Sequence, residues 1–210
     1  MFRYCVAPQP SAGEVWSARM HAMVIGQRAN LLRFLQASVA TWGRPDAVHD
    51  LSTSPERNQW ISSSQVVQLN QRGRTQTKKY RPVLPVPDRF AAIMDATDGL
   101  LVTVSSVRKA FEAMLDELGL PRERETGLKL IRRSVAQLMR REIGEERWIQ
   151  GQMMLGHRKA STSDLYALFN PVNLGTALAA TTELIERIEA LTPGAFSPPV
   201  TGALPDPSPT

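Results

Sequence analysis

The sequence predicts an α+β fold that is mainly α-helical and carries one small antiparallel β-sheet. Most of the chain repeats apolar residues every three or four positions, as amphipathic helices do. The stretch from Trp60 to Val86 differs, because two β-prone runs, SQVVQLN and YRPVLPV, flank the polar segment QRGRTQTKK. This arrangement predicts a hairpin with a basic tip. The chain has 210 residues and 42% hydrophobic content, which is enough apolar material for one core.

The first predicted helices meet in a tight corner. Residues 28–41 carry leucines and a valine at helical spacing, and Gly43 follows as a typical stop signal. Pro45 then begins a second, short helix that is expected to end near Leu51. Arg44 therefore lies between two helices, in a Gly-Arg-Pro corner that aims its side chain in one direction.

The rest of the chain is expected to be mostly helical. The Pro-Asp pair at 87–88 is typical of a helix start, the run LLVTV at 100–104 predicts a third strand, and a serine-capped helix follows to Leu118. Further helices are expected over 127–141, over 145–155, from Ser163 and over 173–191. The tail from residue 193 is rich in proline and is expected to be disordered.

The basic residues are clustered, and the clusters have two interpretations. The net charge is +5 and the sequence pI is about 9.8. Two stretches concentrate the cations: Arg72, Arg74, Lys78, Lys79 and Arg81 in one, and Lys129, Arg132, Arg133, Arg140 and Arg141 in the other. Cations that neutralise phosphates release counterions, so nucleic acid is one candidate partner. The alternative is a solvated basic face, and composition alone does not separate the two.

Several classes of protein are excluded by what the sequence lacks. Cys5 is the only cysteine, so an internal disulfide and a zinc site built on several thiolates are both excluded. No apolar run approaches the ~20 residues that a membrane-spanning helix needs. The N-terminus also lacks the layout of a signal peptide, and we therefore expect a cytoplasmic protein without a membrane partner.

Two segments of the second half place polar residues where function is usually found. In LGHRKASTSDLY, a Leu-Gly-His helix ending carries His157, and Tyr166 follows nine residues later across a polar elbow. In the helix TGLKLIRRSVAQLMRRE, Lys129, Arg132 and Arg133 are spaced at i, i+3 and i+4, so at least the first two share a face. Cations gathered on a partly apolar helix indicate an anionic ligand.

Four blocks of this chain, taken in order, resemble a known family. They are RP-x-A-V-x-x-L from Arg44, the hairpin QTKKYRPVLPV, the helix K-L-I-R-R-S, and LGH followed nine residues later by tyrosine. Together they resemble the catalytic domain of the tyrosine recombinases, the phage-integrase family, over about Arg28 to Leu174. The resemblance implies that family's catalytic-domain fold over residues 28–192, with residues 1–27 as a lead segment and 193–210 as the tail.

The resemblance assigns roles to individual residues. In catalysis, Arg44 and Arg132 are expected to hold the scissile phosphate, Lys129 to donate to one of its oxygens, and His157 to hydrogen-bond it. Lys78 is expected to protonate the leaving oxygen, and Tyr166 is the expected nucleophile. Seven further cations are expected to contact DNA: Arg72, Arg74, Lys79, Arg81, Arg133, Arg158 and Lys159. Two neighbours on a strand point to opposite faces, so whether Lys78 or Lys79 is the hairpin lysine stays open.

The implied chemistry is metal-free strand transfer on double-stranded DNA attachment sites. A phosphodiester repels nucleophiles, and without a metal the developing charge must be met by fixed cations, for which arginine is well shaped. Tyrosine, with a pKa of about 10, needs such cations or a base to act as a nucleophile. No cofactor is implied. The family assembles as a cyclic tetramer, so helix 173–191 is expected to dock on another protomer or to fold back loosely.

Three departures from the family pattern keep other functions open. Lys129 stands where the family most often has histidine, and the acid expected three residues after the first arginine is replaced by Ala47, with Asp46 one place early. The 27 or so residues before the resemblance are too few for the helical DNA-clamping domain that normally precedes it. A non-catalytic DNA-binding remnant of an integrase and a type IB topoisomerase-like nicking and closing enzyme are therefore the alternatives.

Overall fold

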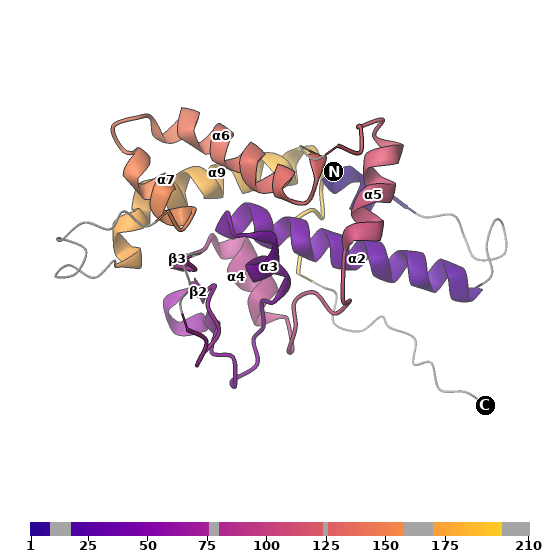
Figure 1. Ribbon diagram of the computed structural model, residues 1–210, viewed down its shortest axis with the longest axis horizontal. Helices are drawn as coiled ribbons and strands as arrows, with labels where there is room; N and C mark the ends of the chain where they lie inside the picture. The colour runs from indigo at the N-terminus through magenta and orange to yellow at the C-terminus, as the bar shows by residue number, and fades with distance from the viewer. Residues whose placement is uncertain (9–17, 76–79, 124–125, 158–169, 199–210) are drawn as a thin grey trace.

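The computed structural model describes residues 1–8, 18–75, 80–123, 126–157 and 170–198. This part of the chain is mainly helical and holds a small antiparallel sheet, so the expected α+β class is confirmed at that level (Figure 1). The helices are α1 Phe2–Val6, α2 Ala18–Thr41, α3 Pro45–His49, α4 Asp88–Asp95, α5 Arg108–Glu117, α6 Lys129–Ile143, α7 Trp148–Met154 and α9 Gly175–Leu191.

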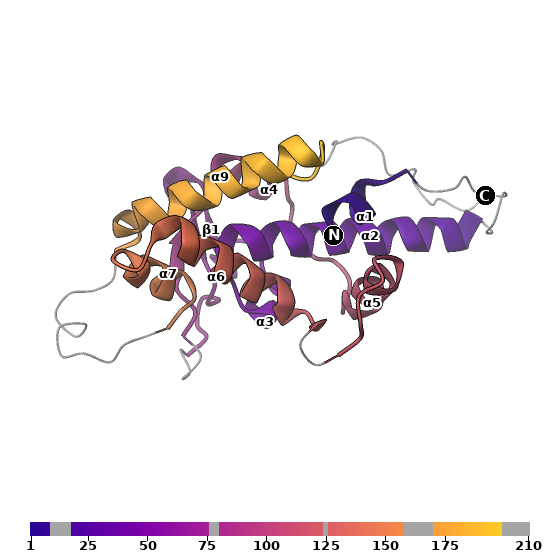
Figure 2. The same cartoon turned by 90° about the horizontal axis from the view of Figure 1, so that it is seen from above.

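Helix α2 is the central element of the fold. It begins about ten residues earlier than the sequence pattern predicts, and it packs against α1, α3, α4, α5, α6 and α9. Figure 2 shows α2 running along the molecule between α9 on one side and α3 and α5 on the other. Leu31, Phe34 and Leu35 of α2 are almost completely buried. Neither α2 nor another helix in the described ranges combines the length and apolar character needed to cross a membrane.

The predicted hairpin is present as two paired strands. Strands β2 (Val66–Gln68) and β3 (Val83–Pro85) are antiparallel with Val67 opposite Leu84, and both of these side chains are buried. The third strand is β1 (Trp60–Ile61), which pairs with β2, and not the expected strand at 100–104. That expectation is wrong because residues after Gly99 (φ +75°) form one isolated bridge and then bend into the core.

Helices α4, α5 and α6 lie close to their predicted positions. The buried face of α6 consists of Ile131, Val135, Met139 and Ile143. Because these positions advance by four residues, the face drifts around the helix and leaves Leu138 at its edge, 42% exposed instead of in the core.

The last helix is packed within its own chain. Helix α9 contacts α2, α6 and α7, and Ala177, Thr181 and Ile185 on it are fully buried. Along its apolar stripe Leu174 and Ile185 are fully buried, Leu178, Leu184 and Ile188 are half-buried, and Leu191 is 69% exposed. The helix therefore folds back on its own chain, and its docking on another protomer stays a prediction. The long α2 supplies the covering surface, which the sequence pattern of α9 alone does not reveal.

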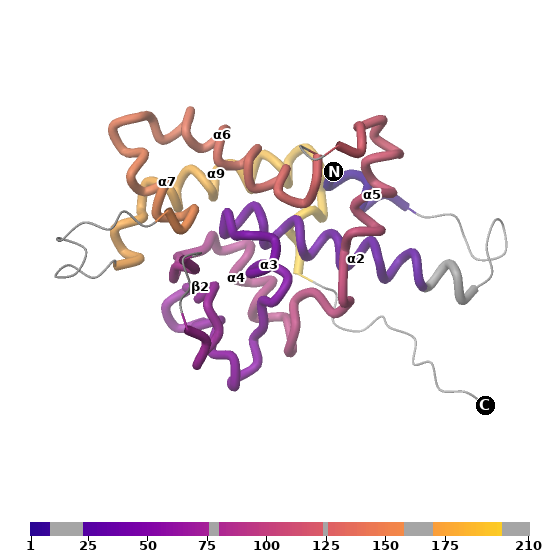
Figure 3. The backbone as a smooth tube through the Cα atoms, in the orientation of Figure 1, coloured from indigo at the N-terminus to yellow at the C-terminus, as the bar shows by residue number. Residues whose placement is uncertain are grey.

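The chain start and the beginning of the Pro-rich tail are part of the core. Figure 3 traces α1 along α2 near the end of α9, and the rings of Phe2 and Phe196 lie 5.4 Å apart. The carboxylate of Glu189 accepts hydrogen bonds from the backbone N–H groups of Gly194 and Phe196 at 2.8 and 2.6 Å. The prediction of disorder from residue 193 is therefore wrong for residues 193–196, because Phe196 supplies a core aromatic group that is 1% exposed.

Candidate functional site

The corner that carries Arg44 is held rigidly from three sides. Trp42, which follows α2, is fully buried with φ +51°, and its Nε1 donates to the Thr181 hydroxyl at 3.1 Å. Its ring stacks on that of Trp148 with centroids 6.3 Å apart. A Cβ on Gly43 would lie 2.6 Å from the Val48 side chain, so glycine is required there. The tight turn places Arg44 at the N-cap of α3.

Arg132 of α6 joins this corner to the end of α7. Its guanidinium donates one hydrogen bond to the Trp42 carbonyl at 2.7 Å and another to the Leu155 carbonyl. Burial, and then the positive charge of Arg44, lower the pKa of Arg132 to about 10, with Asp46 acting in the opposite direction. Arg132 is still a cation at neutral pH. The charges of Arg132 and Arg44 therefore repel each other.

His157 stands at the same place, at the end of α7. The N–H groups of Gly156 and His157 donate to the Met153 and Gln152 carbonyls at 2.9 and 2.8 Å, a common way for a helix to end. Gly156 has φ +63°, and an added Cβ would lie 2.5 Å from the Tyr80 carbonyl oxygen. Burial, then Arg132, then Arg44 lower the pKa of His157, so the ring is neutral at pH 7.

Arg44, Arg132 and His157 thus form one electrostatic group, although they are more than 100 residues apart in sequence. The three reach it from the α2–α3 corner, from α6 and from the end of α7. The carbonyl hydrogen bonds of Arg132 account for its own position, but gathering Arg44 and His157 beside it costs energy, because charges of like sign repel. An anion placed among them would relieve that repulsion and accept their hydrogen bonds.

Asp46 holds the strand β3 end of the hairpin against this corner. Its carboxylate accepts a hydrogen bond at 2.6 Å from Arg81, whose side chain is only 7% exposed. Burial alone would raise the pKa of Asp46, but the hydrogen bond and charge of Arg81 outweigh it and lower that pKa. The guanidinium of Arg81 is thus used inside the protein, and its expected contact with DNA stays a prediction.

Two more of the expected DNA-binding arginines lie on the hairpin arm, and both are exposed. Arg74 forms an ion pair with Asp50 at 3.5 Å, and the backbone N–H of Arg72 donates to the Arg57 carbonyl at 2.9 Å. Five of the predicted site residues lie outside the described residues: Lys78, Lys79, Arg158, Lys159 and Tyr166. Their roles stay predictions.

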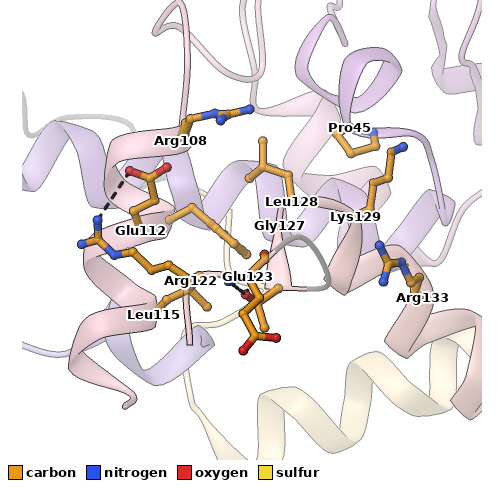
Figure 4. A pocket seen from close by; sticks show the side chains of 12 residues that line it. Pro45, Arg108, Glu112, Leu115, Arg122, Glu123, Gly127, Leu128, Lys129 and Arg133 are labelled. Atoms are coloured by element: carbon orange, nitrogen blue, oxygen red, sulfur yellow. Dashed lines mark hydrogen bonds and ion pairs between the residues drawn. The ribbon is translucent and has the colours of Figure 1, made fainter. Parts of the chain in front are cut away.

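Lys129 and Arg133 line a separate cavity of about 710 Å³ (Figure 4). Pro45, next to Arg44, forms part of its wall, and Arg108 at the start of α5 lies on its opposite side. Helical spacing places Lys129 and Arg132 on one face, whereas in the structure Arg133 shares the cavity with Lys129. Arg132 turns instead toward the Trp42 and Leu155 carbonyls.

Comparisons of the chain with protein-family models, with curated proteins and with solved structures give no match. The geometry of the site and the sequence motifs therefore carry the functional argument. Sequence reasoning missed the contribution of Trp42 and Arg108. A tryptophan before Gly-Arg-Pro was a usable signal, since a buried indole N–H requires a partner, but nothing around Arg108 in the sequence marked it.

Proposed function

We propose that the protein is a DNA strand-transfer enzyme of the tyrosine recombinase type, with that family's catalytic-domain fold. The observation that carries the proposal is the group formed by Arg44, Arg132 and His157. The resemblance implies that these three residues meet at one phosphate. In the structure, burial and the charge of Arg44 lower the pKa of Arg132, and burial and the charges of both arginines lower the pKa of His157. The substrate would be the backbone of double-stranded DNA at an attachment site, and the reaction would take place in the cytoplasm.

The described residues supply the phosphate-binding half of the reaction. Arg132 is held by two carbonyl groups, so its orientation is fixed before a ligand arrives. A guanidinium has five N–H donors, which leaves others free for the non-bridging oxygens of a phosphodiester. Arg44 adds a second cation. The neutral ring of His157 has one N–H to donate, and a phosphate beside it would favour its protonated form.

The bond-making half falls to residues outside the described ranges. In the proposed step the phenolic oxygen of Tyr166 attacks phosphorus, the Tyr166 proton is released, and the bond from phosphorus to the 5′ oxygen breaks. Lys78 protonates that oxygen. One phosphoester replaces another without oxidation or hydrolysis, so a strand hydroxyl can reverse the step and rejoin DNA. The cations stabilise the charge that develops on the phosphate oxygens.

Assembly on DNA belongs to the same proposal. A homotetramer would synapse two attachment sites, and since α9 covers its own core, neighbouring protomers would have to meet through other surfaces or through Leu191. Sedimentation of the protein with a bound attachment site measures this directly.

The decisive experiment detects the covalent intermediate without knowing the target sequence. A library of duplexes with randomised sequence and a nick just 3′ of each test position lets the cleaved 5′-hydroxyl fragment diffuse away. Protein-linked DNA is recovered after denaturation and sequenced. We expect enrichment of one sequence family with the natural chain, none with Tyr166→Phe, and a large loss with Arg132→Ala.

Arg140→Ala serves as the matched control, since Arg140 lies on the same helix but its guanidinium is paired with Glu145 at 2.6 Å on the exposed face. An adduct that survives in Tyr166→Phe would remove the nucleophile assignment. Absence of any adduct with preserved DNA binding would favour the non-catalytic remnant. Adducts without joining of two duplexes, together with relaxation of supercoiled plasmid, would favour the topoisomerase-like alternative.

A further inference from the structure

The cavity between α5 and α6 is lined by more cations than acids, and three of these cations, Arg108, Arg122 and Arg133, have no role in the proposed catalytic step. Its rim carries four cations, Arg108, Arg122, Lys129 and Arg133, against two acids, Glu112 and Glu123. Phe111, Leu115 and Leu128 add apolar surface. Figure 4 shows Arg108 reaching across from α5 toward the side where Pro45 and Lys129 lie.

Two of these cations have no counter-charge within the part of the chain that the structure describes. Arg122 is neutralised by Asp116, with which it forms two hydrogen bonds, and it also lies 4.0 Å from Glu112. Among the described residues, by contrast, the side chains of Arg108 and Lys129 have neither an acidic partner nor a hydrogen bond. They come from different helices and line one cavity. Two unpaired cations facing the same space indicate an anionic ligand.

The start of α6 adds to this charge. The N-terminal end of a helix carries a partial positive charge, which an acid in the first turn would offset. Helix α6 has 15 residues and no acid in its first turn, which instead contains Lys129 and Arg132. Lys129 of this turn lines the cavity and Arg132 of the same turn belongs to the Arg44–Arg132–His157 group, while Pro45 of the cavity wall follows Arg44 in the chain.

We propose that this cavity is a second phosphate site, which binds a DNA backbone phosphate near the one held by Arg44, Arg132 and His157. Arg108 and Lys129 are its charged ligands. The inference rests on the proposed function, because DNA is what would place two linked phosphates at once. A free anion such as inorganic phosphate has the same chemistry, but it would not need two adjoining sites joined by one basic helix turn.

The test compares two neighbouring unpaired cations on α5. Arg108→Gln removes the cavity ligand, and Lys109→Gln is the matched control, because Lys109 is exposed and does not line the cavity. Both are made in a Tyr166→Phe background so that no covalent adduct contributes. Affinity for a short duplex of arbitrary sequence is measured by fluorescence anisotropy over a range of salt concentrations.

Arg108→Gln should weaken binding severalfold at low salt and reduce the slope of log K against log salt by about 0.9, the value for one phosphate contact. Lys109→Gln should change the slope by less than half of that. Arg108→Lys, which keeps the charge, should restore most of the slope. Equal effects of Arg108→Gln and Lys109→Gln would overturn the proposal.

A second arm distinguishes a free anion from DNA. Inorganic phosphate is titrated into the same variants, with amide chemical shifts of Gly127 and Leu128 as the readout. Micromolar phosphate binding that depends on Arg108, with unchanged DNA affinity, would assign the cavity to a small anion and overturn the DNA proposal. Failure of the proposed function appears elsewhere, as absence of the Tyr166 adduct, so the two outcomes are distinguishable.

Discussion

Replacing Gly156 with alanine tests how tightly the end of α7 is seated on the hairpin. Gly156 has φ +63°, and an added Cβ would lie 2.5 Å from the Tyr80 carbonyl oxygen and 3.2 Å from Pro82 Cδ. Gly119, at the end of α5, has nearly the same φ, +64°, but a Cβ there meets nothing within 4 Å. The two glycines therefore share the backbone cost of alanine and differ only in the collision.

The expected magnitudes follow from that comparison. Left-handed alanine costs about 1–2 kcal/mol, and the stiffer unfolded chain returns about 0.4–1 kcal/mol. Gly119→Ala should then lower the free energy of unfolding by about 0–1.6 kcal/mol. At Gly156 the Tyr80 backbone must also move, and overpacking of this kind adds about 1–3 kcal/mol. The total for Gly156→Ala is about 1–4.6 kcal/mol.

The assay is urea denaturation followed by tryptophan fluorescence, with equal m-values required of both variants. Gly156→Ala should be the less stable protein by about 1–3 kcal/mol. Equal stabilities for the two variants would refute the close approach of the helix end to the hairpin. The position of His157 relative to the segment that follows Lys78 and Lys79 would then also be open.

Three further predictions concern charges at the site. Asp46→Asn removes the carboxylate that is ion-paired with the buried Arg81, and it should cost about 1–3 kcal/mol in urea denaturation. This is below the usual range because Asp46 is half exposed. A cost equal to that of the exposed control Asp98→Asn would contradict the pairing. Arg44→Gln removes one of the charges that repel the His157 imidazolium, so the His157 pKa should rise in an NMR titration, and an unchanged pKa would separate the two residues. The folded state holds the pKa of His157 below its ordinary value of 6.5, so between the folded and the unfolded pKa the unfolded chain binds more protons. The free energy of unfolding should therefore fall as pH drops through that window. His157→Asn should remove this part of the pH dependence.

The fold was predictable wherever local signals determine structure. Pro45 begins a helix because its ring fixes φ and it lacks an N–H, and β2 pairs with β3 because two β-prone runs flank a polar tip. The run at 100–104 has the same local signal as a strand, but within the described residues it pairs only through the isolated bridge between Leu100 and Ser52. Leu101 and Val102 are buried in a bend instead. Pairing depends on contacts between distant segments, which residue patterns do not contain.

The residues of the candidate site were predictable from the sequence, but the side chains with which its cations pair were not. The motifs identified Arg44, Arg132 and His157, and their residue types alone indicated an anion. They did not show that Arg81 is buried against Asp46, because an arginine on a strand looks the same whether it faces solvent or an acid 35 positions away. Phe196 was missed for a related reason, since the Pro-rich composition around it is typical of disorder.

The hydrogen bonds of α2 have a consequence for how the protein is made. Gln36 is fully buried, and its amide donates to the Ala195 carbonyl at 2.7 Å, while the indole of Trp42 depends on Thr181. During translation these early residues leave the ribosome long before their partners are synthesised. In a nascent chain that stops short of α9, burial of either group would be unfavourable, because an unsatisfied polar group in a core costs about 1–3 kcal/mol. The growing polypeptide must therefore wait in a partly open, chaperone-accessible state until its final segment closes over α2.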